Sequence, residues 1–169
     1  GRKGKGGFYR RNRDHGGKVK ESIDLATGKY RPQEKAALPE VDAASKHPKA
    51  LLTANTPAGR YAANVVARTL AYAAVLVPDA ADDVVAIDEA MRLGYNWKWG
   101  PFELIDRIGA GAVVEILTAA GEAVPPFLAQ GKPFYRVENG RRQYLDLDGT
   151  YRDIVRPEGV LLLSDALGK

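Results

Sequence analysis

Four carboxylates cluster in the middle of the sequence, where one expected helix ends and the next begins. Asp88 and Glu89 lie in the first helix, and Glu103 and Asp106 follow Pro101 in the second. Such carboxylates could act as general acid and base if burial shifts their pKa and a substrate lies within hydrogen-bond reach. Buried polar groups normally have structural partners. We therefore expect Asp88 and Asp106 to be structural and to accept backbone N–H groups of the intervening loop.

That loop carries an aromatic cluster made of Tyr95, Trp97, Trp99 and Phe102. Large aromatic side chains between two helices usually pack in the core, and this is the interpretation we prefer. The alternative is that the cluster contacts the apolar chain of a ligand. Either role requires the two flanking helices to hold the loop in place.

Several kinds of catalytic or binding site are not predicted. The chain has no cysteine, which removes disulfides, thiol nucleophiles and zinc–thiolate sites. Its two histidines, His15 and His47, lie near no Asp/Ser pairing, and no metal-ligand spacing exists, so we expect neither a triad nor a metal. The glycine-rich residues 1–7 lack the Gly-x-Gly-x-x-Gly and Gly-Lys-Ser/Thr patterns of nucleotide-binding loops. We expect no bound cofactor in this chain.

The positive charge is concentrated in an N-terminal arm. Residues 1–20 carry a net charge of +7, so the remainder of this +4 chain is mildly acidic. Such an arm could bind nucleic acid or another anionic partner through charge alone. It contains few aromatic side chains, and we expect a solvated loop over residues 1–18 and no nucleic-acid partner.

The strongest predicted element is a helix over residues 57–77, with Thr56 as its N-cap and Pro57 at its first position. Arg60, Asn64 and Arg68 form one narrow polar stripe, so we expect the helix to be buried on most sides. Asn64 is expected to be buried and bonded to a neighbouring helix. The charged residues exclude a membrane span, and no membrane association is expected.

The other expected elements follow from periodicity, glycine and proline. They are a weak hairpin over residues 18–31, a connector over 32–55 with one helical turn at 41–46, helices ending at 93 and 109, helices over 112–120 and 124–130, a hairpin with strands at 134–137 and 142–145, and strands at 151–155 and 160–163. The Asn139-Gly140 pair suits a type I′ turn in the second hairpin. No internal repeat is expected. The fold class is mainly α, with a small antiparallel sheet near the C-terminus.

The residues around the carboxylates resemble a known family. Residues 87–94 read Ile-Asp-Glu-Ala-Met-Arg-Leu-Gly, and residues 100–106 read Gly-Pro-Phe-Glu-Leu-Ile-Asp. This pair of motifs resembles the C-terminal helical domain of the 3-hydroxyacyl-CoA dehydrogenases. Residues 1–9 resemble the Gly-rich Phe-Tyr segment that closes the same domain, although here that segment comes first. Fused, multifunctional members carry the domain twice in tandem, and such a tandem would explain the order.

The resemblance implies a domain plan, with an arm that ends a preceding domain (residues 1–37), a helical domain (38–131) and a β appendage (132–169). It also implies a parent enzyme of fatty-acid β-oxidation, fused to enoyl-CoA hydratase, that uses NAD. The implied partners are the NAD-binding domain and the first helical copy of the same polypeptide, with acyl-CoA as the parent's ligand and a homodimer as a further assembly. This chain alone is expected to be inactive and cytoplasmic.

By the same resemblance, Asn64 lies close to a substrate-positioning Asn of the catalytic copy, although Val65 replaces the family's Arg. The aromatic cluster then becomes a candidate contact for pantetheine or an acyl chain. The residues proposed as substrate-side or structural are Asn64, Asp88, Trp97, Trp99, Phe102, Glu103 and Asp106. The other hypothesis is an autonomous helical module that dimerises or grips an anionic partner with its arm.

Overall fold

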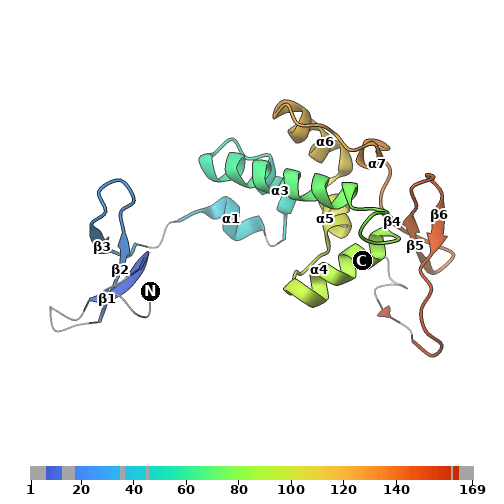
Figure 1. Ribbon diagram of the computed structural model, residues 1–169, viewed down its shortest axis with the longest axis horizontal. Coiled ribbons are helices and arrows are strands. Elements are labelled where there is room, and N and C mark those ends of the chain that lie inside the picture. The colour runs from blue at the N-terminus through green and yellow to red at the C-terminus, as the bar shows by residue number, and fades with distance from the viewer. Residues whose placement is uncertain (1–6, 13–17, 35–36, 45, 161, 164–169) are drawn as a thin grey trace. The chain divides into compact units, whose positions relative to one another are not determined.

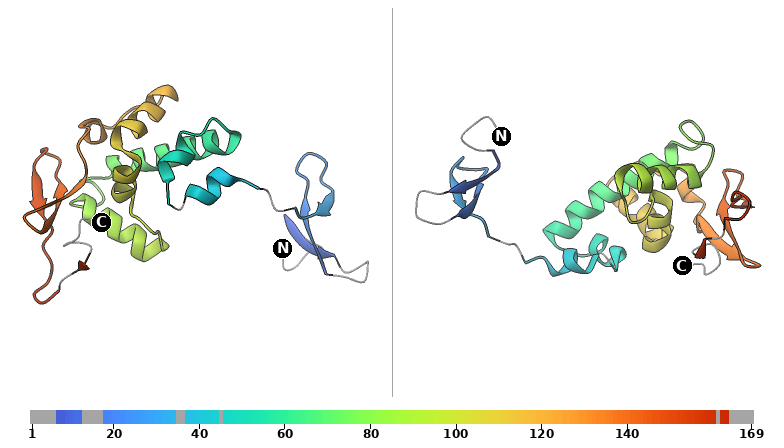
Figure 2. Two further views of the ribbon diagram at one scale, coloured as in Figure 1. Left: turned by 180° about the vertical axis from the view of Figure 1, so that it is seen from behind. Right: turned by 90° about the horizontal axis from the view of Figure 1, so that it is seen from below.

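The computed structural model describes residues 7–12, 18–34, 37–44, 46–160 and 162–163 of the chain. The chain divides into two compact units, which are residues 1–38 (unit 1) and residues 39–169 (unit 2). Unit 1 is a small sheet, whereas unit 2 is mostly helical and ends in a second small sheet (Figure 1). Figure 2 shows this second sheet at the opposite end of unit 2 from helix α1.

Unit 1 is a three-stranded antiparallel sheet with the order β1-β2-β3. Strands β2 (Val19–Ile23) and β3 (Tyr30–Pro32) confirm the predicted hairpin. Strand β1 (Tyr9–Asn12) pairs with β2, so the prediction of loop is wrong for these four residues. The remainder of the predicted loop, residues 1–6 and 13–17, lies outside the described residues.

Unit 2 begins with two short helices, α1 (Pro39–Ala44) and α2 (Pro48–Leu52), where one helical turn was expected. The long helix α3 (Pro57–Val75) follows and confirms the predicted start. The Thr56 hydroxyl accepts a hydrogen bond from the Gly59 N–H at 3.0 Å, which satisfies one of the unpaired donors of the first turn.

Helix α3 has one buried and one exposed face. The buried face consists mainly of small residues, namely Gly59, Ala63, Ala67, Leu70, Ala73 and Ala74. Their size allows α2, α5, α6 and α7 to approach α3 closely. The prediction of burial on most sides is wrong, because Tyr61, Val65, Tyr72 and Val75 are exposed. Asn64 is also exposed, which contradicts its predicted burial.

The next two helices carry the carboxylates. Helix α4 (Val84–Tyr95) is capped by Asp83, and helix α5 (Pro101–Ile108) starts at Pro101. The predicted stop at Gly94 is wrong, because the left-handed residue that ends α4 is Asn96, with φ of 56°. Asparagine tolerates this conformation better than other side chains do.

The rest of unit 2 comprises α6 (Ala110–Ala119), α7 (Pro126–Ala129), β4 (Tyr135–Glu138), β5 (Arg141–Leu145) and β6 (Tyr151–Asp153). Asn139 and Gly140 have φ of 52° and 73°, which confirms the type I′ turn. The predicted strand at 160–163 is wrong for its described residues, since Val160, Leu162 and Leu163 are exposed and form no strand.

The core of unit 2 joins helices and sheet. Phe102, Phe127 and Phe134 form an aromatic cluster with ring centroids 4.8–6.2 Å apart. Phe134 at the start of the sheet and Leu145 in β5 are fully buried against the helices. The predicted fold class, mainly α with a small antiparallel sheet near the C-terminus, is confirmed.

The two sheets repeat each other, which the sequence analysis missed. Both are antiparallel meanders, and both begin with the tripeptide Phe-Tyr-Arg, at residues 8–10 and 134–136. The Phe8 carbonyl accepts the Ile23 N–H, as the Phe134 carbonyl accepts the Leu145 N–H. These pairs place Ile23 and Leu145 at the same position of their sheets.

The side-chain contacts of the two sheets correspond as well. Arg10 stacks on Tyr30 and Arg136 stacks on Tyr151, each 3.9 Å from the ring centroid. The Tyr30 hydroxyl donates to the carbonyl of residue 7, and the Tyr151 hydroxyl donates to the carbonyl of residue 133. Each acceptor is the residue immediately before the Phe-Tyr-Arg tripeptide. We call this shared structure the Phe-Tyr-Arg ribbon (described residues 7–12 and 18–32 for the first, and 133–153 for the second).

Candidate functional site

Asp88 of α4 caps the first turn of α5. Its Oδ1 accepts the Phe102 N–H at 2.8 Å, and its Oδ2 accepts the Glu103 N–H at 3.0 Å. The N-cap residue of α5 is Gly100, which has no side chain to accept these donors. A side chain from α4 therefore satisfies the orphan N–H groups of α5 and places a negative charge at its positive end.

This arrangement requires glycine at position 100. A Cβ at Gly100 would lie 2.3 Å from the Asp88 Cβ, so any side chain there would push the two helices apart. Glu103 completes the cap, because its Oε2 accepts the Gly100 N–H at 3.0 Å. The motif Gly-Pro-Phe-Glu therefore has a local physical basis, in which each residue serves the junction between α4 and α5.

Asp106, one turn further along α5, holds the C-terminal ribbon. Its two oxygens accept the Phe134 and Tyr135 N–H groups at 2.7 and 2.8 Å. The Tyr135 hydroxyl in turn donates to Asp88 at 2.9 Å. The expected donors were backbone N–H groups of the aromatic loop. Phe102 of that loop donates to Asp88, as expected. The expectation is wrong for Asp106, which binds the ribbon.

Burial changes the ionisation of this cluster. It raises the pKa of Asp88 to about 7 and the pKa of Asp106 to about 6, although the hydrogen bonds to both carboxylates oppose the change. Burial and the neighbouring Asp88 charge raise the pKa of Tyr135 well above its usual range, so its hydroxyl remains a donor. These two carboxylates have the shifted pKa of an acid/base pair, but all four of their oxygens accept hydrogen bonds from the protein.

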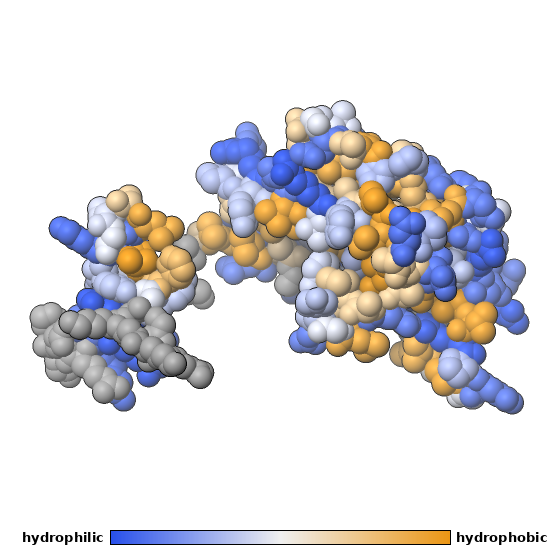
Figure 3. All heavy atoms as spheres, viewed as in Figure 1, coloured by the Kyte–Doolittle hydropathy of each residue, from blue (hydrophilic) through white to orange (hydrophobic). Residues whose placement is uncertain are grey.

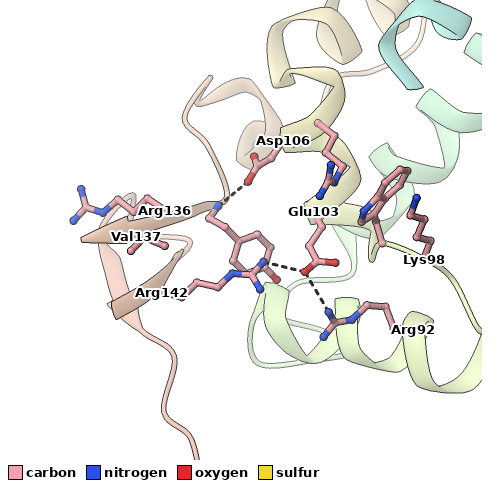
Figure 4. A pocket seen from close by; sticks show the side chains of 10 residues that line it. Arg92, Lys98, Glu103, Asp106, Arg136, Val137 and Arg142 are labelled. Atoms are coloured by element: carbon pink, nitrogen blue, oxygen red, sulfur yellow. Dashed lines mark hydrogen bonds and ion pairs between the residues drawn. The ribbon is translucent and has the colours of Figure 1, made fainter. Parts of the chain in front are cut away.

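Glu103 links α4, α5 and the ribbon through charge. Its Oε1 accepts hydrogen bonds from Arg92 at 3.3 Å and from Arg142 at 2.9 Å (Figure 4). Arg142 also lies over the Tyr135 ring, 4.3 Å from the centroid. Both oxygens of Glu103 are thus engaged by groups of the protein.

A cleft of about 640 Å³ opens beside this network. Figure 4 shows α4, α5 and the ribbon converging on it. Its walls contain five cationic side chains, two carboxylates and the Trp99 indole; the lining residues are Arg92, Lys98, Trp99, Glu103, Asp106, Arg107, Tyr135, Arg136, Val137 and Arg142. Three of these cations are ion-paired within unit 2, Arg92 and Arg142 with Glu103 and Arg136 with Glu138.

The structure separates the predicted site residues into two groups. Asp88, Trp99, Phe102, Glu103 and Asp106 belong to the junction or to its cleft. Of the predicted aromatic core, only Phe102 is buried, because Tyr95 is exposed and Trp97 and Trp99 are half-buried. Asn64 lies on the exposed face of α3 and does not line the cleft.

Sequence analysis missed Tyr135, Arg142 and Phe134 as parts of this junction. They lie 28 to 47 residues from their partner carboxylates, beyond the reach of motif spacing. One available signal was the repeated Phe-Tyr-Arg tripeptide, which marks the start of both ribbons.

The described residues do not fit a dinucleotide site. Both sheets in the described ranges are antiparallel meanders, whereas such sites use a parallel strand that leads through a glycine-rich turn into a helix. Among these residues no group of three metal-ligating side chains is found, and no helix is long and apolar enough to cross a membrane.

Comparison with known proteins agrees with the motifs. Residues 59–136 match the family described as "3-hydroxyacyl-CoA dehydrogenase, C-terminal domain". The chain is 35% identical over 88% of its length to a "Probable 3-hydroxyacyl-CoA dehydrogenase" of Bacillus subtilis. It is 30% identical over 98% of its length to a "Putative fatty acid oxidation complex trifunctional enzyme" of Rickettsia felis.

The helical unit therefore belongs to the C-terminal domains of the 3-hydroxyacyl-CoA dehydrogenase family. The similar proteins are much longer, because this chain spans 20% of the Bacillus protein and 22% of the Rickettsia felis protein. The match runs from within α3 to the start of β4, so it includes Asp88, Glu103 and Asp106 but not Arg142.

Proposed function

We propose that this chain is an assembly region of an NAD-dependent 3-hydroxyacyl-CoA dehydrogenase of fatty-acid β-oxidation, and that it performs no chemistry alone. Unit 2 would be one copy of the C-terminal helical domain, and the first ribbon would close a preceding copy. The oxidation of 3-hydroxyacyl-CoA by NAD would occur in other domains of the longer parent, which are the partners of this chain.

The exposure of Phe8 and Tyr9 is the observation that carries this proposal. In the second ribbon Phe134 is fully buried and its neighbour Tyr135 is bonded to Asp88 and Asp106. The equivalent Phe8 and Tyr9 are 71% and 69% exposed. The same ribbon thus occurs once with a helical domain to dock on and once without it. A preceding copy of the helical domain would bury Phe8 and Tyr9.

The exposed face of α3 supports an assembly role independently. Tyr61, Val65, Arg68, Tyr72 and Val75 follow one another at spacings of four and three residues, which places them in a single stripe. Four of the five are apolar or aromatic and exposed. The fifth, Arg68, forms an ion pair with Glu122. We call this stripe the α3 seam. Such spacing suits packing against another helix. Figure 3 shows hydrophobic patches on the surface of unit 2 between hydrophilic ones.

The engagement of the carboxylates supports the absence of chemistry. All six oxygens of Asp88, Glu103 and Asp106 already accept hydrogen bonds from the protein. A catalytic acid or base must have an oxygen available to the substrate. This region would therefore shape and stabilise the enzyme.

The proposal is tested by replacing Phe8 in two settings. In the 169-residue chain, Phe8→Ala should leave thermal melting unchanged, since Phe8 is mostly exposed there. In the longer parent, the same substitution should lower the melting temperature, because a buried Phe→Ala costs about 3–5 kcal/mol. Phe134→Ala is the matched control and should destabilise both proteins. An unchanged parent would contradict the proposal.

A second candidate is a homodimer formed by the α3 seam. The seam is self-complementary in chemistry, and closed two-fold pairing is the commonest assembly of soluble proteins. Sedimentation of the chain across a concentration series distinguishes the candidates. A dimer that Tyr72→Glu abolishes would favour the homodimer. A monomer at all concentrations would contradict the homodimer and favour contact of the seam with another domain of the parent.

A further inference from the structure

The helices of unit 2 recognise the edge of the second ribbon through its hydrogen-bond donors. Asp106 accepts the backbone N–H groups of Phe134 and Tyr135. Asp88 accepts the Tyr135 hydroxyl. Because a carboxylate has two oxygens, it matches two adjacent N–H groups and fixes both the position and the direction of the edge. Recognition of this ribbon therefore depends on charge-assisted hydrogen bonds as well as on the burial of Phe134.

The first ribbon presents the same donors at an open sheet edge. Strands β1 and β4 are the outer strands of their three-stranded sheets. The Ile23 N–H donates to the Phe8 carbonyl, and hydrogen-bonded pairs alternate from there, so the Tyr9 N–H points away from β2. The side chains of Phe8 and Tyr9 are mostly exposed. This edge thus carries counterparts of the donors that Asp106 and Asp88 bind in the second ribbon.

A cation occupies the same register position in both ribbons. Arg142 of β5 lies opposite the residue two positions after Tyr135, and it donates to Glu103 at 2.9 Å. Lys20 of β2 lies opposite the residue two positions after Tyr9, and it is exposed. Residues two apart in a strand share a face of the sheet with the residues directly opposite them. The tyrosine and the cation therefore lie on one face in each ribbon.

The other face of each ribbon is engaged by contacts within the ribbon. Arg10, which points away from the Tyr9 face, donates to Glu21 at 2.5 Å. Arg136 donates to Gln143 at the equivalent position, at 2.8 Å. Each arginine also stacks on a tyrosine of its own third strand. Contact with a partner therefore falls to the Tyr9 face and the adjoining edge.

The charge of the Tyr9 face favours an acidic partner. Arg11 is exposed and lies opposite Lys20, at the position where the second ribbon has Val137. This face thus has one more positive charge than its counterpart. A neutral surface would desolvate these cations without compensation, whereas carboxylates offset the cost.

We propose that this face docks on a helical surface whose carboxylates are placed as Asp88, Glu103 and Asp106 are. One carboxylate accepts the Tyr9 hydroxyl, one pairs with Lys20, and one accepts both N–H groups of the edge. The inference rests on the proposed function, because it assigns that surface to the preceding helical domain of the longer parent. It adds the chemistry of the contact, in which two carboxylates lie three residues apart on one helix and the third lies on the helix before it.

Hydrogen exchange of the backbone tests the docking. Peptides that cover residues 7–12 should exchange at least about tenfold more slowly in the longer parent than in the 169-residue chain, because a carboxylate holds the outward amides. Lys20→Glu in the parent should remove most of this protection. Tyr9→Phe, which removes only a hydroxyl, is the second variant if Lys20→Glu alters exchange in the isolated chain. Lys49→Glu, an equal change of charge at an exposed position of α2, is the control and should keep the protection.

A photoreactive cross-linker identifies the partner. Benzoylphenylalanine at position 11 of the parent lies on the same face as Lys20 and leaves Tyr9 in place. Irradiation followed by peptide mass spectrometry should show a link to a helical segment of the preceding domain that bears two carboxylates three residues apart. A link to α4 or α5 of a second copy, or the lack of any link, would overturn the assignment.

The outcomes separate this inference from the proposed function. If Phe8→Ala destabilises the parent but Lys20→Glu and Tyr9→Phe leave the amides protected, the edge is buried without recognition by carboxylates, and only this inference fails. If Phe8→Ala leaves the parent unchanged and the amides exchange as fast as in the 169-residue chain, the proposed function fails as well.

Discussion

At the scale of single residues, Asp88 accepts the N-terminal N–H groups of α5 that a side chain at the N-cap position would otherwise accept. Gly100 must be glycine to let α4 approach, and this leaves the first N–H groups of α5 without a local acceptor. The two oxygens of Asp88 accept those N–H groups, and one of them also accepts a hydrogen bond from the Tyr135 hydroxyl. One side chain therefore joins two helices and a strand, which explains a fully buried charge-bearing group in a small domain.

Replacing Asp88 by Ala should destabilise the chain by about 1–3 kcal/mol, because buried donors would be left unpaired. Urea unfolding of the isolated chain measures this change, and Asp148→Ala, at an exposed turn, is the control. In the longer parent, turnover per folded molecule should change little. A wild-type urea midpoint together with a hundredfold loss of turnover would make Asp88 catalytic.

The stability of the chain should depend on pH between about 5 and 8. Asp88 and Asp106 have pKa values of about 7 and 6 in the folded state, above the value of about 4 in an unfolded chain. In this window the folded state binds more protons, so stability is greatest at the lower pH and falls as the pH rises through 6 and 7.

Denaturant unfolding at pH 5, 6, 7 and 8 measures this dependence. Each group contributes at most about 1.4 kcal/mol per pH unit within its window. Asp88→Asn should flatten the upper part of the curve, and Asp106→Asn the lower part. A wild-type stability that increases steadily from pH 5 to pH 8 would show that the hydrogen bonds outweigh burial.

At the scale of elements, α3 has one face in the core of unit 2 and another on its exposed surface. Its small-residue face lets four other helices pack closely, and its seam of larger residues remains exposed. The exposed apolar residues of the seam contribute nothing to the core of unit 2, so the packing of unit 2 does not explain their regular spacing. In the proposed assembly this seam would contact a partner helix.

Leu70→Ala should destabilise unit 2 by about 2–5 kcal/mol, since Leu70 is fully buried in the core. Tyr72→Ala, two residues away on the seam, should change the stability of the isolated chain by less than about 0.5 kcal/mol. Urea midpoints measure both. If the two variants have equal midpoints, α3 is not oriented as described.

The two ribbons show that one element can be stable in two environments. Each ribbon has the same strand order and the same stacked Arg–Tyr pair, although one Phe is buried and the other is exposed. Both ribbons thus share their internal contacts, and in the proposed tandem arrangement the Phe-Tyr edge of each would contact a helical domain. This division of roles suits a module that is used repeatedly along one polypeptide.

At the scale of the whole molecule, the isolated chain should form no NADH from a 3-hydroxyacyl-CoA and should bind no measurable NAD at a dinucleotide fold. The described sheets lack the parallel strand–turn–helix unit that such binding uses. Absorbance at 340 nm with a heat-inactivated control checks the first statement. NADH formation above that control would refute the proposed lack of chemistry.

The sequence alone determined most of the helical elements and the family. Thr56, Pro57 and Pro101 mark helix starts through purely local chemistry, and Asn139-Gly140 selects its turn in the same way. These signals depend on neighbours in the chain, which explains why the structure agrees with them. Local rules failed where two candidates compete, as at Gly94 and Asn96, because either residue tolerates the left-handed conformation.

Only the tertiary structure decided which residues meet. Tyr135 and Arg142 reach Asp88 and Glu103 across 47 and 39 residues of chain, and no spacing rule connects them. The exposure of Asn64 and of the α3 seam was likewise decided by packing, because a sequence rich in apolar residues does not specify how many faces its own unit covers. The cleft beside the junction exists for the same reason, since its lining residues are brought together from α4, the following loop, α5, β4 and β5 by folding alone.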